Sequence, residues 1–493
     1  MLRVSIVVLL TSCVPSKEPA ERDTDATPVD TDDDTGAVAG ESGAPQDSDS
    51  APPDDTDTGG SAEPDWRDGV LVGDATGGAA GSAGTLAALD LDGDGVDELV
   101  VGAPGTRDGQ VWVVSGEVLP EAEGLLRDAA SVALMGWFAG WLAPYRGDAN
   151  GDGVDDLAVG RGETLLPGTG AGAVYLFQGG EDLASATSLL DARAEIDEQT
   201  GGEMVRFGAL GDLDGDGLAD LVVGASQAND ADWEWGDSGM VSIWLEGGPT
   251  GSHSTADADD SIFGTWFEEG LGATLAAGDL DDDGYADLLV GAPEWETDLG
   301  VVGVVRGQAS GDWPHQLEAA ATTLVYGAEG VASLGNDPFC SLGDLDADGS
   351  LDLVVTSSAV GGVWLWSGVP TGVTGPASAD VQVMGDAGTL GAAVACDGDL
   401  DGDGADDLLV GDPLADGVGA VHLFLNPLGG AGALGSAAAD RSLYGASDGD
   451  KFGAAIRALD GLRGDGIGTF AVGAPGADAG AINGGATYLY TPR

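Results

Sequence analysis

The chain has 493 residues, 87 of them glycine, and a formal net charge of −70 at pH 7. Nucleic acids and anionic lipid surfaces attract basic residues, so this charge argues against both and leaves divalent cations, cationic partners or plain solvation. Hydrophobic residues make up 43% of the chain, which is enough for a core, so the acidity does not indicate global disorder. Acid enrichment for a salt-rich habitat would explain the charge but not its spacing along the chain.

The N-terminus resembles the signal of a bacterial lipoprotein. It has a basic Arg3, an apolar run at 4–10 and then the letters LTSC, which end at Cys13. We predict a signal peptide over residues 1–12 and a lipid on Cys13, with an ordinary secretory peptide as the alternative. The protein is then exported and attached to the cell envelope through this lipid. Val14 favours the outer membrane or cell surface, by analogy with lipoprotein sorting.

Residues 13–65 form a low-complexity segment rich in Asp, Thr, Pro and Gly. Stretches such as DTDDDTG cannot bury enough apolar area to offset the entropy lost on ordering. We predict a disordered linker that holds the folded part away from the membrane, with a binding tail as the alternative. The folded domain is expected to cover residues 66–493.

An acidic loop followed by an apolar run recurs seven times in this domain, about every 60 residues. The copy at 278–293 reads GDLDDDGYADLLVGAP, and the copy at 210–226 reads LGDLDGDGLADLVVGAS. In the first six copies the first, third and fifth loop positions are Asp or Asn, the sixth is Gly and the ninth is Asp or Glu. Alternate residues of such a loop can direct their oxygen atoms to one centre, because the glycine permits the tight turn.

This donor set points to calcium. Calcium takes about six to eight hard oxygen ligands, one of them here the backbone carbonyl of the seventh position, whereas magnesium keeps several waters. Like charges about 4 Å apart repel by roughly 4 kcal/mol at an effective dielectric near 20, which argues against a merely solvated Asp-Gly turn. We therefore predict up to six Ca²⁺ ions. The predicted ligands are, in the first loop, Asp90, Asp92, Asp94, Val96 and Glu98; in the second, Asp148, Asn150, Asp152, Val154 and Asp156; in the third, Asp212, Asp214, Asp216, Leu218 and Asp220; in the fourth, Asp279, Asp281, Asp283, Tyr285 and Asp287; in the fifth, Asp344, Asp346, Asp348, Ser350 and Asp352; and in the sixth, Asp399, Asp401, Asp403, Ala405 and Asp407.

The seventh copy has lost this donor set. It carries Gly461, Arg463 and Thr469 at the first, third and ninth positions, so we expect no ion there. EF-hand loops share the D-x-D-x-D-G opening of the other copies, but they close with an acid at position twelve and lead into a helix. Here position twelve is valine, as at Val101 and Val290, and the next residues are typical of a strand. Nonapeptide β-helix repeats have a much shorter period.

Each copy continues with the same short strands. A buried run such as DLLVGAP follows the loop, then an alternating run such as GQVWVVSG at 109–116, then a short run such as TTLVYG. Four strands repeated seven times, without helical periodicity, predict an all-β fold, a seven-bladed β-propeller of four-stranded blades. The seventh copy stops after its third strand, and we predict that residues 70–72 supply its fourth strand and close the ring.

Several apolar residues are expected in the core. Cys340 and Cys396 precede two successive acidic loops, and we expect two small buried thiols, with a disulfide between them as the open alternative. Tryptophans that alternate within the third strands are also expected to be buried: Trp112, Trp244, Trp364 and Trp366.

These units resemble FG-GAP repeats, which build the seven-bladed propeller at the head of integrin α subunits. The likeness rests on the D-x-D-x-D-G-x-x-D loop followed by V-G-A-P. The Phe-Gly pair is literal or weakened at Phe207-Gly208, Leu271-Gly272, Leu390-Gly391 and Phe452-Gly453. The resemblance implies calcium hairpins on the lower face and ligand contacts on the upper face, through the loops that join strands two to three and four to one.

The resemblance further implies a binding or adhesion module for an extracellular protein or glycan ligand, with calcium mainly structural. A calcium-dependent lectin is the alternative. Tryptophans beside acids suit sugars or cationic peptides, although they can also cap blade edges. We expect a monomer and no enzyme, because the three histidines lie in separate contexts and neither G-x-S-x-G nor H-E-x-x-H occurs. The candidate ligand-binding residues are Trp137, Trp141, Trp233, Trp235 and Trp295.

Overall fold

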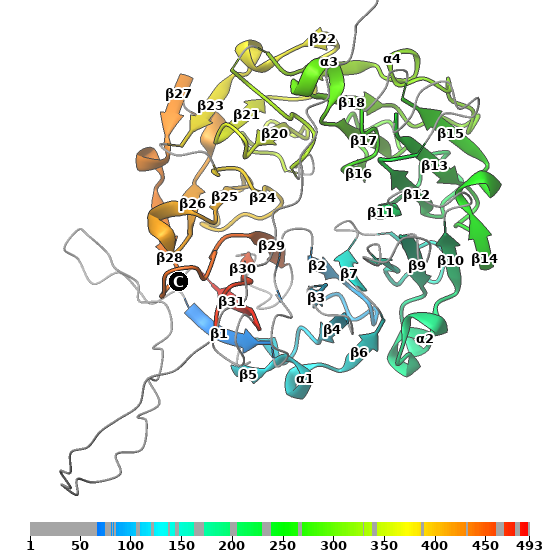
Figure 1. Cartoon of the computed structure of the whole chain (residues 1–493), viewed down its shortest axis with the longest axis horizontal. Helices are drawn as coiled ribbons and strands as arrows, with labels where there is room; N and C mark the ends of the chain where they lie inside the picture. The colour runs from blue at the N-terminus through cyan, green and yellow to red at the C-terminus, as the bar shows by residue number, and fades with distance from the viewer. Residues whose placement is uncertain are drawn as a thin grey trace, which may run out of the picture. The chain divides into compact units, whose positions relative to one another are not determined.

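A computed structural model describes most residues between 67 and 491. Residues 1–66 lie outside the description, as do 74–79, 81, 83–84, 105–108, 120–122, 137–138, 143–146, 162–171, 198–204, 229–237, 265–268, 329, 338–342, 386–388, 430–431, 460–467, 479–483 and 492–493. Within the unit Ser50–Arg493, the described strands form seven sheets that follow one another around a common centre (Figure 1). Each sheet is one blade.

The blades are numbered in chain order, and the strands of each are given from the innermost described strand outward; in blade five the first of these, β20, follows the acidic loop and corresponds to the second strand of the other blades. Blade one consists of β2 (Leu86–Leu89), β3 (Glu98–Ala103), β4 (Gln110–Val114) and β6 (Val132–Met135), and blade two of β7 (Ala139–Leu142), β8 (Leu157–Arg161), β9 (Ala173–Phe177) and β10 (Ala194–Asp197). Blade three consists of β11 (Val205–Gly211), β12 (Asp220–Ala225), β13 (Met240–Trp244) and β15 (Asp260–Phe263), and blade four of β16 (Leu275–Gly278), β17 (Asp287–Ala292), β18 (Val301–Val305) and β19 (Thr323–Tyr326).

The last three blades close the ring. Blade five consists of β20 (Leu353–Ser357), β21 (Gly362–Trp366) and β23 (Val381–Met384), and blade six of β24 (Ala393–Ala395), β25 (Leu408–Asp412), β26 (Ala420–Phe424) and β28 (Arg441–Tyr444). Blade seven consists of β29 (Ala455–Leu459), β30 (Thr469–Ala474), β31 (Ala486–Tyr490) and β1 (Arg67–Val72). The seven-bladed all-β propeller expected from the repeats is thereby confirmed.

The seventh blade is completed by the N-terminal strand β1, as the sequence predicted. β1 runs antiparallel to β31 and pairs Val70 with Tyr488 and Val72 with Ala486. The first and last repeats also meet at the centre, where β2 contacts β29. The two ends of the repeat array are therefore joined by backbone hydrogen bonds within one sheet, which leaves no open edge between them.

Short parallel strands at the outer rim were not predicted from the sequence. β5 (Glu123–Leu125) pairs with β1, β14 (Gly251–Ser254) with β10, β22 (Gly372–Thr374) with β19, and β27 (Gly432–Gly435) with β23. Each comes from the repeat that follows the blade it joins, so it ties neighbouring blades together. These strands are too short and too exposed to show the alternating pattern that marks a strand in a sequence.

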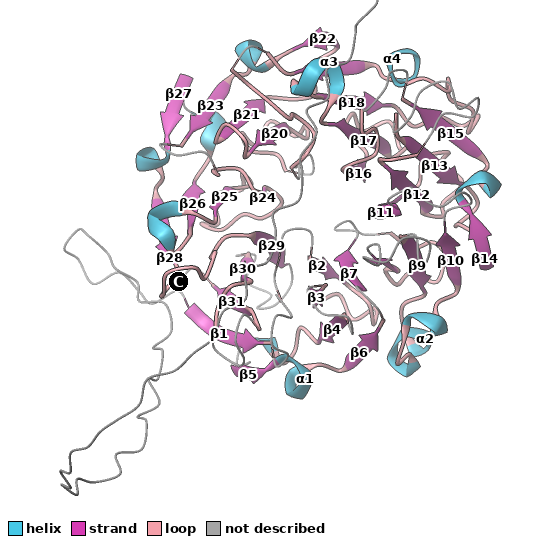
Figure 2. Ribbon diagram, in the orientation of Figure 1, coloured by secondary structure: helices cyan, strands magenta, loops and turns pink. Residues whose placement is uncertain are grey.

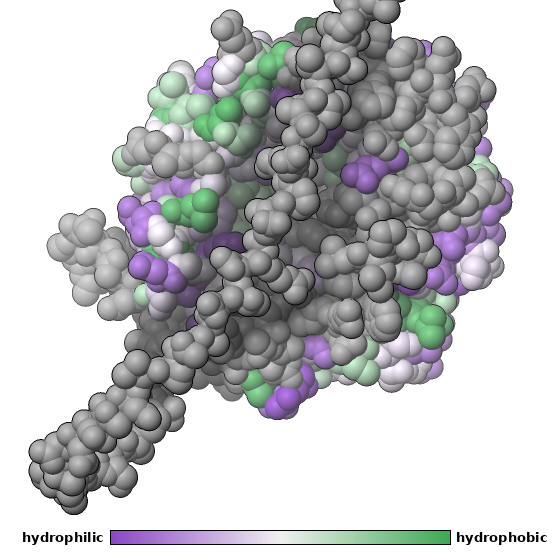
Figure 3. Space-filling view, in the orientation of Figure 1, coloured by the Kyte–Doolittle hydropathy of each residue, from purple (hydrophilic) through white to green (hydrophobic). Residues whose placement is uncertain are grey.

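The described part of the chain has four short α-helices, which lie mostly toward the outer edge of the ring (Figure 2). They are α1 (Leu126–Ala129), α2 (Glu181–Ser185), α3 (Trp295–Asp298) and α4 (Leu317–Ala320). Among the described residues, no helix has both the length and the apolar character needed to cross a membrane. Exposed hydrophobic side chains gather in Figure 3 on the rim over β22 and β23, where Val373 is 73% exposed.

The second strands are buried along almost their whole length because both faces of each blade are covered. In β17, Leu288 and Val290 pack in the core between blades three and four, whereas Leu289 packs with Leu353 of blade five. A strand buried on both faces does not alternate, which explains runs such as DLLVGA. The predicted core tryptophans of the third strands are confirmed, each at most 4% exposed: Trp112, Trp244, Trp364 and Trp366.

One cysteine departs from the expectation of a free buried thiol. Cys396 is buried as expected, but it is disulfide-bonded. The chain has two other cysteines, Cys13 and Cys340, and both lie outside the described residues, so the partner of Cys396 is not described. The backbone of Gly343, three residues after Cys340, packs directly on Cys396: a Cβ at Gly343 would lie 3.2 Å from the Cys396 sulfur.

Ring closure by β1 can be tested at Leu71, which is fully buried in a core that includes residues of the first and seventh blades. Leu71→Ala is expected to lower the free energy of unfolding by about 2–5 kcal/mol, because it removes a buried side chain and leaves a cavity. The measurement is denaturant unfolding. Leu190→Ala, at a leucine that is 85% exposed, is the matched control and is expected to change little. Equal effects of the two variants would contradict closure through β1.

Candidate metal centre

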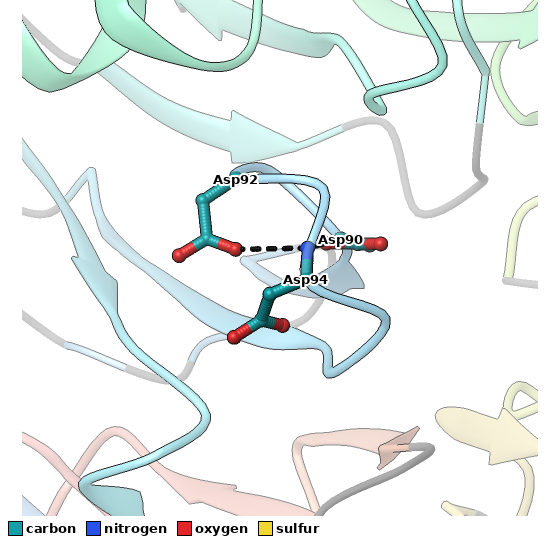
Figure 4. A group of neighbouring side chains, drawn as sticks. All are labelled: Asp90, Asp92 and Asp94. Atoms are coloured by element: carbon teal, nitrogen blue, oxygen red, sulfur yellow. Dashed lines mark hydrogen bonds between the residues drawn. The ribbon is translucent and has the colours of Figure 1, made fainter.

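Each acidic loop leads into the second strand of its blade, and wherever the innermost strand is described the loop joins the two. The first loop, between β2 and β3, folds around the carboxylate of Asp90, whose Oδ1 accepts the backbone N–H of Gly93 at 2.8 Å and whose Oδ2 accepts that of Gly95 at 3.0 Å. Asp92 accepts the N–H of Asp94 at 3.2 Å, the dashed contact in Figure 4, and Asp94 accepts that of Val96. The loop thus turns on its own carboxylates and brings alternate side chains together.

The same fold recurs in the six loops. The backbone N–H of the sixth-position glycine donates to the first-position carboxylate in every one, over 2.7–3.0 Å. This glycine has a positive φ each time, from 85° at Gly153 to 94° at Gly404. Residues with a Cβ rarely adopt that conformation, so the glycine is required by the turn.

The ninth-position carboxylate lies at the base of the loop and is almost fully buried. In the first loop, Glu98 Oε2 accepts the backbone N–H of Leu91 at 2.9 Å, and its Oε1 accepts that of Gly116 at the end of the third strand at 3.3 Å. The first of these contacts occurs in all six loops, and the second in five of them. One side chain therefore joins the loop, the second strand and the third strand.

The third loop is the exception, because one oxygen of its ninth-position carboxylate has no hydrogen-bond partner. Asp220 is 0% exposed, and its Oδ2 accepts the N–H of Leu213, but its Oδ1 is buried without a hydrogen-bond partner. A buried, unpaired carboxylate oxygen is costly. Asp212, Asp214 and Asp220 offer ligand atoms that all lie within 4.8 Å of one another. A cation beside this oxygen would satisfy it.

Burial raises the pKa of the ninth-position acids. The pKa of Glu98 is raised to about 7, that of Asp220 to about 7 and that of Asp407 to about 7, chiefly because burial penalises the charged form. The pKa values of Asp156 and Asp352 are raised to about 6 for the same reason. Nearby loop carboxylates add to each shift. A bound cation would favour the charged forms and reverse the shifts.

Neighbouring loops are hydrogen-bonded to one another around the ring. The backbone N–H of the eighth position donates to the first-position carbonyl of the preceding loop, as from Asp155 to Asp90 at 3.0 Å and from Ala286 to Asp212 at 2.7 Å. The same bond joins loop three to loop two, loop six to loop five, and the seventh repeat to loop six. The first-position residue is therefore held in place by two blades.

The grouping of the predicted ligands fits a hard divalent cation. In loops one and five, the acids at positions one, three and five lie within 4.8 Å of one another, as do those at positions one, three and nine in loops three, four and six. In loop two the third position is Asn150, whose amide donates to Asp152 at 3.0 Å. Clustered carboxylate oxygens are ligands that Ca²⁺ prefers. The seventh-position carbonyls remain predicted ligands.

The seventh repeat replaces the buried acid with a neutral contact. Thr469, at the ninth position, is 4% exposed, and its hydroxyl lies 2.9 Å from that of Thr491 just after the third strand. The hairpin base is thus held without a charge. Gly461 and Arg463 lie outside the described residues.

The five candidate ligand-binding tryptophans do not form an exposed group among the described residues. Trp295 departs from the expectation of an exposed residue: it is 4% exposed in α3 and makes an edge contact with Tyr326, with ring centroids 6.0 Å apart. Its apolar surface is covered because α3 folds it back into the core of blade four. Trp141 belongs to the inner strand β7 rather than to a loop. Trp137, Trp233 and Trp235 lie outside the described residues.

Three of the four Phe-Gly positions have a common structural role at the contacts between blades. Phe452 is fully buried and packs edge-on against Tyr488 and Tyr490. Gly453 has a φ of 87°, and its N–H donates to the carbonyl of Gly473 in the V-G-A-P segment at 3.0 Å. Leu271 and Leu390 are equally buried, and the glycines after them make the same bond. The weakened pairs therefore keep the geometry of Phe452-Gly453. The other literal pair, Phe207-Gly208, departs from it: it lies within strand β11 and pairs with Gly224 and Val223 of β12.

Comparison with known proteins identifies these repeats. The family model for the FG-GAP repeat matches residues 82–114, 204–244 and 271–305, which belong to repeats one, three and four. Integrin alpha-PS2 of Drosophila melanogaster is 32% identical over 234 residues, which cover 45% of this chain and 16% of that protein. Integrin alpha-IIb of Homo sapiens is 31% identical over 218 residues, covering 42% of this chain and 19% of that protein.

A third relative has an enzyme's name. Phosphatidylinositol-glycan-specific phospholipase D of Dictyostelium discoideum is 29% identical over 162 residues, covering 30% of this chain and 17% of that protein. The matched part is thus less than a fifth of the length of each of these three relatives. Together with the seven-bladed fold, the three matched segments show that this chain carries FG-GAP repeats and is similar over part of its length to integrin α subunits.

Proposed function

We propose that this chain is a calcium-stabilised binding or adhesion module, exported and lipid-anchored at Cys13, that takes an extracellular protein or glycan as its ligand. The observation that carries the proposal is the repeated loop. Six hairpins at the same place in six blades present hard oxygen donors with the same backbone geometry. The lipid on Cys13 and the linker at 13–65 would place the domain at 66–493 away from the envelope surface.

Calcium would serve the structure rather than a reaction. When bound, it would neutralise the clustered carboxylates and act as a common ligand of each loop. The residues of the chain do the rest: the first-position carboxylate orders the loop backbone, and the ninth fixes the loop to the third strand. An ion at a hundred times its dissociation constant would add roughly 2.7 kcal/mol of stability per site, if the unfolded chain binds none.

The binding role is supported by similarity to integrin α subunits and by the surface of the strand two–three loops. Glu294 and Asp298 flank or end α3 in blade four, and Asp416 lies in the matching loop of blade six, all three exposed. The chain as a whole has a net charge of −70. This charge and the three exposed acids favour a ligand with a basic surface. No residue of this chain is assigned a catalytic role.

Ion counting tests the calcium loops directly. Asp92→Ala is expected to bind one ion fewer than the unchanged protein by mass spectrometry under native conditions, because the alanine removes a predicted oxygen ligand that also accepts the backbone N–H of Asp94. Asp182→Ala, at an exposed acid of α2 outside the loops, is the matched control and should leave the count unchanged. Identical counts for both variants would count against the first loop as a site.

The calcium-free protein is expected to become less stable as pH rises from 5 to 8. Five of the six ninth-position acids have pKa values raised to about 6 or about 7 when folded, against ordinary values of 3.8 for Asp and 4.5 for Glu, and the pKa of the sixth, Asp287, is also raised. Their contribution to stability is therefore full below pH about 4 and is lost as pH rises through 6 to 7. Thermal unfolding in a chelating buffer measures this trend.

Two comparisons sharpen that measurement. Excess calcium should raise the melting temperature at pH 8 by many degrees and remove the decline, because the ion favours the charged carboxylates. Glu98→Gln should show a smaller decline in the chelating buffer, since one titrating group is gone. A calcium-free protein that melts at the same temperature at pH 5 and pH 8 would contradict the role given to these acids.

The binding role can be tested with arrays of immobilised glycans and of basic and acidic extracellular proteins. We expect calcium-dependent binding to a basic protein or a glycan. For a basic protein, binding should weaken between 0.1 M and 1 M salt, because the Debye length falls from about 10 Å to about 3 Å. Asp416→Asn should weaken that binding, with Asp182→Asn as the control. Binding in chelator that equals binding in calcium would argue against the proposal.

A further inference from the structure

One position directly follows the paired residues of each third strand, and in two blades its side chain contacts the acidic loop of the same blade. It follows the last residue paired with the second strand, such as Val305, which pairs with Leu288. It precedes the residue whose N–H reaches the ninth-position carboxylate, such as Gly307, which donates to Asp287 at 3.0 Å. The residues at this position in repeats one to six are Ser115, Gln178, Leu245, Arg306, Ser367 and Leu425. Arg306 is the sole charged residue of the six.

This position can reach the third-position ligand of its loop. In blade five, the Ser367 hydroxyl donates to Asp346 Oδ2 at 2.9 Å. In blade four, Arg306 Nη1 lies 3.3 Å from Asp281 Oδ2, and it also donates to Asp287 Oδ2 in a short contact. Two blades thus show the same approach, once with a neutral hydroxyl and once with a guanidinium.

The contacts of Arg306 fall within the candidate ion site itself. Asp279, Asp281 and Asp287 are the acids of loop four whose ligand atoms lie within 4.8 Å of one another, and Arg306 bridges two of them. Its side chain is 20% exposed, and its backbone carbonyl is fixed by the indole N–H of Trp313 at 2.8 Å. Trp313 is itself 4% exposed, so the strand end that carries the guanidinium is firmly packed.

We propose that Arg306 is a built-in cation that substitutes for calcium in loop four and makes this loop the weakest calcium site of the ring. The inference rests on the proposed function, since it assumes that the other loops bind calcium. A guanidinium hydrogen-bonded to two carboxylates satisfies them in the way that a metal would. An arriving Ca²⁺ ion must displace it or bind beside a like charge, and both lower the affinity.

The consequence is that loop four and the other five loops depend on calcium to different degrees. Loop four stays ordered when calcium is low, because its charge is already compensated from within the chain. The other loops present serine, glutamine or leucine at this position and depend on an external ion. Loop four also donates its eighth-position N–H to the first-position carbonyl of loop three, so an ordered loop four supports its neighbour.

The test compares Arg306→Ser with the unchanged protein. The serine copies the residue found at Ser115 and Ser367, so the fold should be kept, which circular dichroism checks. Calcium titration, followed by ion counting in native mass spectrometry, should show the weakest site of the unchanged protein tightened about tenfold or more in the variant. Adding Asp279→Asn to Arg306→Ser should abolish that gain, which assigns it to loop four.

The mirror variant is Ser367→Arg, which places a guanidinium beside Asp346 in loop five. It should weaken one calcium site by a similar factor, whereas Arg306→Lys, which keeps the positive charge, should tighten the weakest site less than Arg306→Ser does. Indistinguishable calcium titrations for Arg306→Ser and the unchanged protein would overturn the inference and leave the proposed function standing. An unchanged protein that binds no calcium at all would overturn the proposed function, and this inference with it.

Discussion

The fold depends on one buried carboxylate in each of six blades, at the base of the loop between the first two strands. In five of these blades its two oxygens accept backbone N–H groups from the loop and from the end of the third strand, as Glu98 does from Leu91 and Gly116, whereas Asp220 of the third blade makes only the contact within the loop. Burial makes the charged form of this acid expensive, so its pKa rises. The same group that fixes the hairpin therefore creates the demand for a cation beside it.

Three kinds of contact join neighbouring blades, and one of them is made by the acidic loops. The N–H group at the eighth position of one loop donates to the first-position carbonyl of the preceding loop. The glycine of a Phe-Gly position in one blade packs against the glycine of the V-G-A-P segment of the neighbouring blade. At the outer rim, short parallel strands such as β22 join one blade to the next. Disturbing one loop thus shifts the first-position residue of its neighbour, which couples the candidate ion sites through backbone contacts.

Surface features separate the scaffold from what it can bind. Trp295 is committed to the core, so the strand two–three loop of blade four presents Glu294 and Asp298 instead of an aromatic ring. That outcome moves the binding hypothesis from aromatic stacking toward charge complementarity at this loop. Arg306 shows the opposite case, where a cation inside the chain satisfies acids that would otherwise need an external one.

The sequence by itself determined the number of blades, the position of every acidic loop and the closing strand at 70–72, because these features repeat with a fixed residue spacing. It also determined that residues such as Gly95 must turn the loop, since the requirement for positive φ is local. Only the tertiary structure decided what lies across from each loop. The guanidinium beside Asp281, the disulfide at Cys396, the burial of Trp295 and the parallel strands at the rim are contacts between segments distant in the chain or between side chains whose direction the pattern leaves open. A period fixes what recurs; the packing of one blade on another fixes what each copy touches.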